Sequence, residues 1–200
     1  MKPEFVKYLQ QDSILIVDCD TKKKVLDAIV AHACTRCTMD EDQIREAILK
    51  RERMMTTGVG KGLALPHIRI SGFPSPLVIV VVCRNPITDY KTLDEEPVKL
   101  AVFFAADERD PEAYLKLLGS ISSRLKEDNV IPSIIAAGDD RKKIFEILSA
   151  ECPFWTGFPV QKQSFLRIFQ ALCQFRGVCP GPPPDVLRSV RRDAPSFRVA

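Results

Sequence analysis

One histidine in this chain has a setting suited to chemistry. His67 follows Pro66 at the end of a short apolar run, Leu63 to Leu65, and a glycine-rich segment precedes that run, with Gly58, Gly60 and Gly62. A neutral imidazole is a nucleophile near pH 7, and a proline before it fixes the backbone that presents the ring. On the residues alone, an alternative interpretation is a glycine turn before a strand with an exposed histidine. For an isolated histidine we favour that alternative.

The glycine-rich segment does not fit the common nucleotide-binding loops. The GxxxxGK[ST] spacing of a P-loop is absent. A dinucleotide fingerprint would need its third glycine at Leu63 and a strand before the loop, whereas the residues before the loop have helical spacing. We therefore expect no nucleotide cofactor.

A second cluster of reactive side chains lies earlier in the chain. Cys34 and Cys37 form a CxxC pair, with His32 two residues upstream. Structural zinc sites usually have four ligands, and no second CxxC or HxxxH accompanies this pair. The pair is not followed directly by histidine, which excludes the CxxCH haem attachment motif. A helix end is the favoured interpretation, metal or redox chemistry is the alternative, and we predict no metal and no cofactor.

Composition and charge restrict the class of protein. The longest apolar run, Leu77 to Cys83, is far too short to cross a bilayer. The N-terminal residues 1–12 lack the apolar core of a secretory signal. We therefore expect a cytoplasmic protein without a membrane span, whose seven cysteines are reduced.

The charge pattern divides the chain into a body, residues 1–152, and a C-terminal extension, residues 153–200. The net charge of +3 arises near the end, because residues 151–200 contain seven Lys or Arg against three Asp or Glu. Seven of the fifteen prolines also lie in the extension. We expect it to be disordered or to form one amphipathic helix from Gln161 to Phe175. The body has no basic signature, so no nucleic-acid partner is expected, although contact of the basic extension with nucleic acid or an acidic surface is an alternative.

Apolar strand-like runs alternate with helical patterns along the body. Strands are predicted at Ser13–Cys19, Leu63–Leu65, Leu77–Cys83 and Val98–Ala106. Helices are predicted to begin after Asp20 or Thr21, Asp40, Asp110 and Asp139, with a further short helix or turn ending at Gly138. This alternation predicts an α/β or α+β body, a sheet covered by helices.

The residues around His67 resemble the signature of the IIA domain of the bacterial phosphotransferase system. The resemblance rests on Arg51-Glu52 followed by the string TGVGKGLALPH, Thr57 to His67. The strand LAVFFAA, the Leu-rich helix after Asp110 and the closing helix then follow in the family's order. The resemblance covers roughly three quarters of the chain. It is to the fructose/mannitol type, which includes the nitrogen-regulatory proteins, and it implies the mannitol-type α/β fold, a mixed β-sheet flanked by helices.

The resemblance implies a role for several of these residues. His67 would accept a phosphoryl group from a phosphorylated histidine carrier protein, and Arg51 would stabilise the transferring group. Without the resemblance, a solvated charge at a helix end is the simpler interpretation of Arg51. The glycines would let the loop pack near the site, and their backbone N–H groups are candidate phosphoryl ligands: Gly58, Gly60 and Gly62.

Two positions depart from the family's pattern. Tyr114 stands where the family has a second histidine, and Ile68 stands where a small residue is common. A tyrosine hydroxyl can donate a hydrogen bond to a phosphoryl oxygen but is not titratable near pH 7. Tyr114 is therefore a candidate binding residue.

The resemblance implies a phosphocarrier in a regulatory rather than a sugar-uptake role. No IIB-like or membrane IIC segment is recognisable in the sequence, as in the nitrogen-regulatory branch. Expected partners are the phosphorylated carrier and either regulatory proteins or a separate IIB protein. The alternative is a regulatory binding protein, non-catalytic or switched by phosphorylation, in which Tyr114 impairs transfer.

Overall fold

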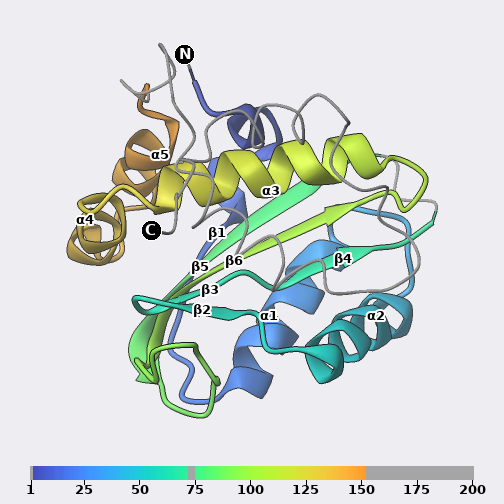
Figure 1. Ribbon diagram of the computed structural model, residues 1–200, viewed down its shortest axis with the longest axis horizontal. Coiled ribbons are helices and arrows are strands. Elements are labelled where there is room, and N and C mark those ends of the chain that lie inside the picture. Colours follow the sequence, from blue (N-terminus) through green and yellow to red (C-terminus); the bar gives the residue numbers. More distant parts are fainter. Residues whose placement is uncertain (1, 72–74, 152–200) are drawn as a thin grey trace, which may run out of the picture. The chain divides into compact units, whose positions relative to one another are not determined.

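The computed structural model describes residues 2–71 and 75–151, and these form a mixed sheet with helices on both faces (Figure 1). The predicted fold class is confirmed. The predicted extension, residues 153–200, and its helix from 161 to 175 lie outside the described residues.

The sheet has six strands in the order β1-β5-β6-β3-β2, with β4 also paired to β6. Pairing is parallel for β1 with β5 and for β6 with β3 and β4, and antiparallel for β5 with β6 and β2 with β3. The strands are β1 Ile14–Val17, β2 Gly58–Gly60, β3 Leu63–Ala64, β4 His67–Arg69, β5 Leu77–Ile87 and β6 Val98–Ala106. The prediction for β6 is matched residue for residue, whereas β1 is shorter and β5 longer than predicted.

Strands β3 and β4 follow one path along the edge of β6. Leu63 pairs with Leu100 and His67 pairs with Phe104, so the register with β6 is unchanged across the interruption at Leu65–Pro66. The carbonyl of Pro66 still accepts a hydrogen bond from Phe104 N at 3.2 Å. Proline has no N–H to continue a ladder, so the interruption falls directly before the histidine.

In the sequence analysis the glycine-rich segment is treated as a loop, whereas the structure forms a strand and a tight turn from it. Gly58–Gly60 form β2, and the chain reverses at Lys61-Gly62 into β3. Lys61 has φ of 54° and Gly62 has φ of 70°. Two successive positive φ values are typical of the tight hairpin turns that match strand twist, so this turn needs a glycine at position 62.

The helices begin close to their predicted caps. They are α1 Lys22–Cys34, α2 Glu41–Met54, α3 Pro111–Leu125, α4 Val130–Ala137 and α5 Arg141–Ser149, and two short 3₁₀ helices, Glu4–Tyr8 and Gln11–Ser13, precede β1. The side chains of Thr21, Asp40 and Asp110 cap α1, α2 and α3. For α5 the prediction of Asp139 is wrong by one residue: Asp140 accepts from Lys143 N at 2.9 Å, while Asp139 forms an ion pair with Arg84.

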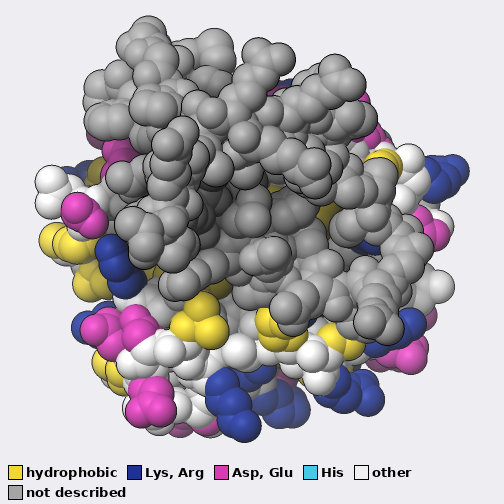
Figure 2. Space-filling model, in the orientation of Figure 1, with side chains coloured by type: hydrophobic (Ala, Val, Ile, Leu, Met, Phe, Trp, Pro, Cys, Tyr) yellow, Lys and Arg dark blue, Asp and Glu magenta, His cyan; other side chains and the backbone are white. Residues whose placement is uncertain are grey.

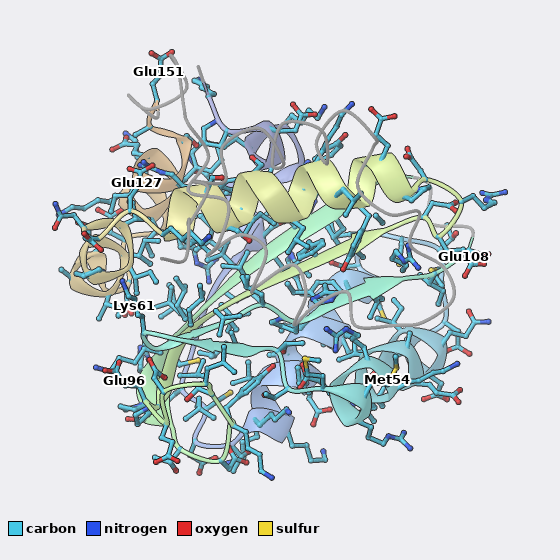
Figure 3. All side chains as sticks on the ribbon, in the orientation of Figure 1. Met54, Lys61, Glu96, Glu108, Glu127 and Glu151 are labelled. Atoms are coloured by element: carbon cyan, nitrogen blue, oxygen red, sulfur yellow. The ribbon has the colours of Figure 1, made fainter. Side chains whose placement is uncertain are left out.

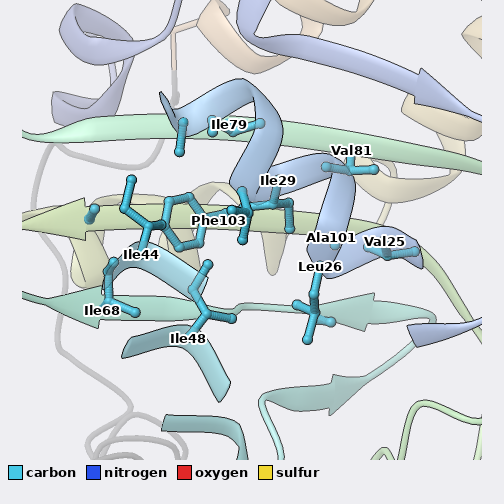
Figure 4. Packing of buried hydrophobic residues seen from close by; sticks show 14 of the residues in the cluster. Val25, Leu26, Ile29, Ile44, Ile48, Ile68, Ile79, Val81, Ala101 and Phe103 are labelled. Carbon is cyan, nitrogen blue, oxygen red and sulfur yellow. The ribbon is translucent and has the colours of Figure 1, made fainter. Parts of the chain in front are cut away.

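Helices α1 and α2 cover one face of the sheet. Figure 4 shows the packed side chains of Val25, Leu26, Ile29, Ile44, Ile48, Ile68, Ile79, Val81, Ala101 and Phe103. Ile44 and Ile48 are fully buried, and Arg51 continues their stripe because positions i, i+4 and i+7 share one helix face. The packing of α2 therefore directs Arg51 toward the sheet.

Helix α3 covers the other face (Figure 1). Its buried stripe begins with Tyr114 and continues through Leu117, Leu118, Ile121 and Leu125. Phe103 belongs to the cluster under α1 and α2, so its neighbour Phe104 points to the α3 face, since successive strand residues alternate. In Figure 1, β4 lies between α2 and α3, and both helices can therefore supply side chains to it.

Candidate active site around His67

His67 is the first residue of β4 and lies in a closely packed setting, with an exposed fraction of 3%. Its ring stacks on that of its register partner Phe104, with centroids 5.2 Å apart and an interplanar angle of 16°. Residues paired across adjacent strands lie side by side on the same face. The strand pairing therefore places the imidazole beside Phe104, and the stacking contact orients its plane.

The two ring nitrogens of His67 have different partners. Nδ1 lies 2.7 Å from the carbonyl oxygen of Leu65, and Arg51 Nε donates to Nε2 at 3.0 Å. A carbonyl oxygen only accepts hydrogen bonds, so Nδ1 carries the proton. Nε2 then holds the lone pair, and it is the nucleophilic atom of this ring.

The same surroundings keep the imidazole neutral. Burial, with the neighbouring charge of Arg51 as the next cause, lowers the pKa of His67 to about 3. At pH 7 the ring is therefore neutral, with its one proton on Nδ1, and the lone pair of Nε2 is available for bond formation.

Arg51 is fixed in the last turn of α2. Its Nη1 donates to the carbonyl oxygen of Met55 at 3.0 Å, while its Nε bonds to His67. The guanidinium thus spans the end of the helix and the imidazole. A planar group with N–H donors left over is suited to bind two oxygens of a phosphoryl group.

Below Arg51 lies a buried polar network that the sequence analysis did not predict. The carboxylate of Glu52 accepts hydrogen bonds from the hydroxyls of Thr57 and of Tyr90, the latter at 3.1 Å. The ammonium of Lys22 lies 2.6 Å from Glu52 Oε2 and 4.5 Å from the centroid of the Tyr90 ring. Lys22 and Tyr90 are far from the motif in sequence, and no spacing rule connects them to it.

This network is linked to both partners of the imidazole. Glu52 directly follows Arg51 in α2, and its hydrogen bond to Thr57 ties the helix end to the next segment. The carbonyl of Thr57 accepts from Leu65 N at 2.9 Å, and the carbonyl of Leu65 accepts from His67 Nδ1. One buried carboxylate therefore helps to hold the groups on either side of the ring.

The three glycines lie elsewhere along the motif. A Cβ on Gly58 would collide with the carbonyl oxygen of Lys91, and one on Gly60 would lie 2.7 Å from Asp94 Oδ2. A Cβ on Gly62 would meet the carbonyl oxygen of Pro97 at 3.4 Å. In Figure 3, Lys61 in the turn and Met54 at the end of α2 lie on opposite sides of the view. The glycines let the hairpin pack against residues 91–97, and a direct role with phosphoryl oxygens stays a prediction.

The structure brings Tyr114 to His67 and turns Ile68 away from it. The rings of Tyr114 and His67 are tilted at 54° with centroids 5.8 Å apart. Ile68 is buried in the cluster under α1 and α2, on the other face of β4. Its bulk therefore does not crowd the imidazole.

The CxxC pair has no metal-binding neighbours in the described part of the chain. Cys34 and Cys37 are free thiols, and Cys37 Sγ lies 3.3 Å from the carbonyl oxygen of Ala33. Within residues 2–71 and 75–151, no three His, Cys, Asp or Glu side chains are grouped so that they could hold a metal ion.

Two further features are the character of the helices and the distribution of charge on the surface. The helices of the described residues are all too short or too polar to cross a membrane. On the face shown in Figure 2, acidic and basic side chains of the described residues are interspersed.

The site and fold can now be compared with known proteins. Residues 7–151 match the family model of the phosphoenolpyruvate-dependent sugar phosphotransferase system, EIIA 2. The chain belongs to this EIIA type 2 family. The family predicted from the string ending in His67 is thereby confirmed.

Curated relatives of this EIIA protein include nitrogen regulatory proteins. That of Pseudomonas aeruginosa is 34% identical over 119 residues, which are 59% of this chain and 77% of the relative. That of Escherichia coli K12 is 27% identical over 133 residues, 66% of this chain and 81% of the relative.

Solved structures show the same fold. The nitrogen regulatory protein IIA-Ntr from Neisseria meningitidis aligns with a TM-score of 0.67 at 20% identity, covering 72% of this chain and 99% of that one. IIA mannitol from Escherichia coli aligns with a TM-score of 0.59 at 17% identity, covering 70% and 99%.

Proposed function

We propose that this EIIA protein is a phosphocarrier whose His67 Nε2 accepts a phosphoryl group from a phosphorylated histidine carrier protein. The observation that carries the proposal is the pair of contacts on the imidazole. Leu65 O fixes the proton on Nδ1, and Arg51 marks the side of the Nε2 lone pair. Membership of a phosphotransfer family supports this use of the ring.

The transfer step follows from the tautomer. The Nε2 lone pair of His67 forms a bond to phosphorus, and the P–N bond to the carrier's imidazole breaks, with its electron pair returning to that nitrogen. Nδ1 keeps its proton, and the carbonyl oxygen of Leu65 offsets the positive charge that develops on the ring. The same step in reverse passes the group to the next acceptor.

Arg51 has the second role in this proposal. Its guanidinium moves its hydrogen bonds from Nε2 to the phosphoryl oxygens as the group arrives, and so offsets their charge. Gly58, Gly60 and Gly62 act indirectly, because they seat the hairpin whose Thr57 carbonyl holds Leu65.

The role proposed for the phosphorylated protein is regulatory and cytoplasmic. Relatives are named nitrogen regulatory proteins, and a mannitol IIA enzyme has been solved in complex with phosphorylated IIB. Partners would therefore be the carrier and either regulatory proteins or a separate IIB protein. Phosphorylation of His67 would change the charge of the surface that a partner meets.

A second candidate function is a regulatory binding protein in which phosphotransfer is impaired. It is favoured by Tyr114, whose ring lies beside His67 and carries a phenol hydroxyl in place of a second imidazole. Native protein and a His67→Asp variant, used as baits for the same partners, separate the two. Equal binding by both would support this second candidate.

The test of the phosphocarrier function is labelling of the full chain with phosphoenolpyruvate, the general transfer enzyme and the histidine carrier. We expect acid-labile phosphate on the native protein and none on His67→Ala. His32→Ala is the matched control, since His32 is the chain's other histidine, and it should label like the native protein. The proposal is wrong if native protein gains no phosphate or if His67→Ala gains as much.

A further inference from the structure

A second arginine lies close to His67 on the same strand. Arg69 follows two residues later in β4, where side chains at i and i+2 point to the same face. At a rise of about 3.3 Å per residue, the two Cα atoms are separated by roughly 7 Å, within the reach of an arginine side chain. Arg69 also contributes to the lowered pKa of His67, after burial and Arg51.

Tyr114 holds this arginine in place. The Cζ atom of Arg69 lies 5.3 Å from the centroid of the Tyr114 ring. That ring is in turn 5.8 Å from His67 and 5.6 Å from Phe104, centroid to centroid. A guanidinium at this distance from an aromatic face is attracted by the ring quadrupole. Tyr114 thus touches both the imidazole and the second cation.

Within residues 2–71 and 75–151, no carboxylate forms an ion pair with the charge of Arg69. Among the described residues it has no ion pair, in contrast to Arg45, Arg84 and Arg109. Its side chain is only half-buried, so its N–H donors can still meet an arriving anion. A cation that pairs with no carboxylate of the described residues, and lies beside a neutral nucleophile, favours a negatively charged ligand.

We propose that Arg69, held against the ring of Tyr114, is a second phosphoryl-binding residue that acts with Arg51 on the group carried by His67. This inference rests on the proposed function. Once the P–N bond to Nε2 has formed, the Arg69 guanidinium donates hydrogen bonds to phosphoryl oxygens. The stacking contact reduces the conformational freedom that the side chain would otherwise lose on binding.

The first experiment compares Arg69→Gln, Arg69→Lys and native protein in the rate of phosphoryl transfer from the carrier. We expect Arg69→Gln to be about 10- to 100-fold slower, the loss of one charged hydrogen bond, and Arg69→Lys to fall in between. Arg53→Gln is the matched control, because it removes the same charge from α2 on the side of the helix away from Arg51. Equal rates for Arg69→Gln and Arg53→Gln would overturn the proposal.

A second readout excludes a purely structural role for Arg69. The second ionisation of the phosphoryl group on His67 can be followed by ³¹P NMR as the pH changes. A neighbouring guanidinium favours the dianion, so Arg69→Gln should raise the pKa of the phosphoryl group and Arg53→Gln should not. An unchanged titration in Arg69→Gln would contradict direct contact.

Variants at Tyr114 test whether its ring is the platform, that is, the surface against which the Arg69 guanidinium is held. Tyr114→Phe keeps the ring and should lose less of the transfer rate than Tyr114→Leu, which removes the ring. Because both side chains act through one contact, adding Tyr114→Leu to Arg69→Gln should cause little further loss. A loss in Tyr114→Phe as large as in Tyr114→Leu would overturn the platform. Thermal unfolding identifies any variant that has lost its fold.

Titration of the unphosphorylated protein with inorganic phosphate separates this inference from the proposed function. The ¹⁵N signals of the His67 ring report binding, and we expect weaker binding in Arg69→Gln than in Arg53→Gln. Arg69-dependent phosphate binding in a protein that accepts no phosphoryl group would remove the proposed function while still supporting Arg69 as a phosphate ligand beside His67. Phosphate binding that is equal in the two variants would count against Arg69.

Discussion

Strands β3 and β4 lie one after the other along β6, and the contacts at the hairpin before β3 differ from those at His67 in β4. At the hairpin end, backbone meets backbone, and glycines at positions 58 and 60 leave room for residues 91–97. At the β4 end, side chains from distant elements meet on one ring: Arg51 from α2, Phe104 from β6 and Tyr114 from α3. We call the hairpin end the structural half of the motif and the surroundings of His67 the chemical half. The side chains that contact the imidazole belong to the chemical half.

The largest effect should come from Arg51→Gln, at the chemical end. Removing one preorganised charged donor from a reacting group typically costs about 100- to 1,000-fold in rate. We expect that loss in phosphoryl transfer, with a smaller loss of thermal stability from the missing hydrogen bonds to Met55 O and His67 Nε2. Rapid-quench labelling measures it. A normal transfer rate in Arg51→Gln would contradict the role of Arg51 in phosphoryl transfer.

Glu52→Gln tests the link between the two halves. Breaking a buried ion pair by neutralising one partner costs about 3 kcal/mol or more, and Lys22 would be left beside an uncharged amide. Urea unfolding should show a loss of this size, and folded protein should transfer more slowly because Arg51 and Leu65 are both less well held. A free energy of unfolding equal to that of the native protein would show that the network does not contribute this stability.

Gly58→Ala should affect the structural half alone. The new Cβ collides with the carbonyl of Lys91, and overpacking of this kind costs about 1 to 3 kcal/mol. Denaturant unfolding measures that cost. Below the melting temperature, transfer should stay close to native. Gly119→Ala is a control, since its Cβ would meet no atom within 4 Å. A selective loss of transfer in Gly58→Ala would instead favour the predicted phosphoryl role of the glycines.

The smallest effect concerns pH and arises from His67 itself. Burial and Arg51 depress its pKa to about 3 in the folded state, against about 6.5 in the unfolded chain. Below pH 6.5 the unfolded state binds a proton that the folded state does not, so stability falls as the pH falls toward 3. Between pH 6 and pH 5 the native protein should lose about 1 kcal/mol more than His67→Gln does. Urea unfolding at the two pH values measures the difference, and equal losses would contradict the buried neutral ring.

The fold was predictable where a pattern is local. Unbroken apolar runs predicted β5 and β6, and caps such as Asp110 marked the starts of helices. The hairpin was missed because glycine permits both loop and strand, and only pairing with β3 decides between them. The error at Asp139 has the same origin, because two neighbouring aspartates are equal as caps until Arg84 pairs with one.

The site was predictable only as far as the contiguous motif reaches. His67 and Arg51 follow from a string of residues, and the structure joins them by a hydrogen bond. Leu65 O, Phe104 and the network of Lys22, Glu52 and Tyr90 depend on how distant segments meet, which no spacing encodes. Arg69 could have been noticed from its position two residues after the histidine, since that spacing places both side chains on one face of a strand.

The most direct test of the account is the position of phosphorus on the ring of His67. The full-length protein, labelled with ¹⁵N and phosphorylated through the histidine carrier, can be examined by ¹⁵N–¹H and ³¹P NMR. We predict phosphorus on Nε2 and a proton retained on Nδ1, as the contacts with Arg51 and Leu65 require. Phosphorus on Nδ1, or on His32, would contradict the account.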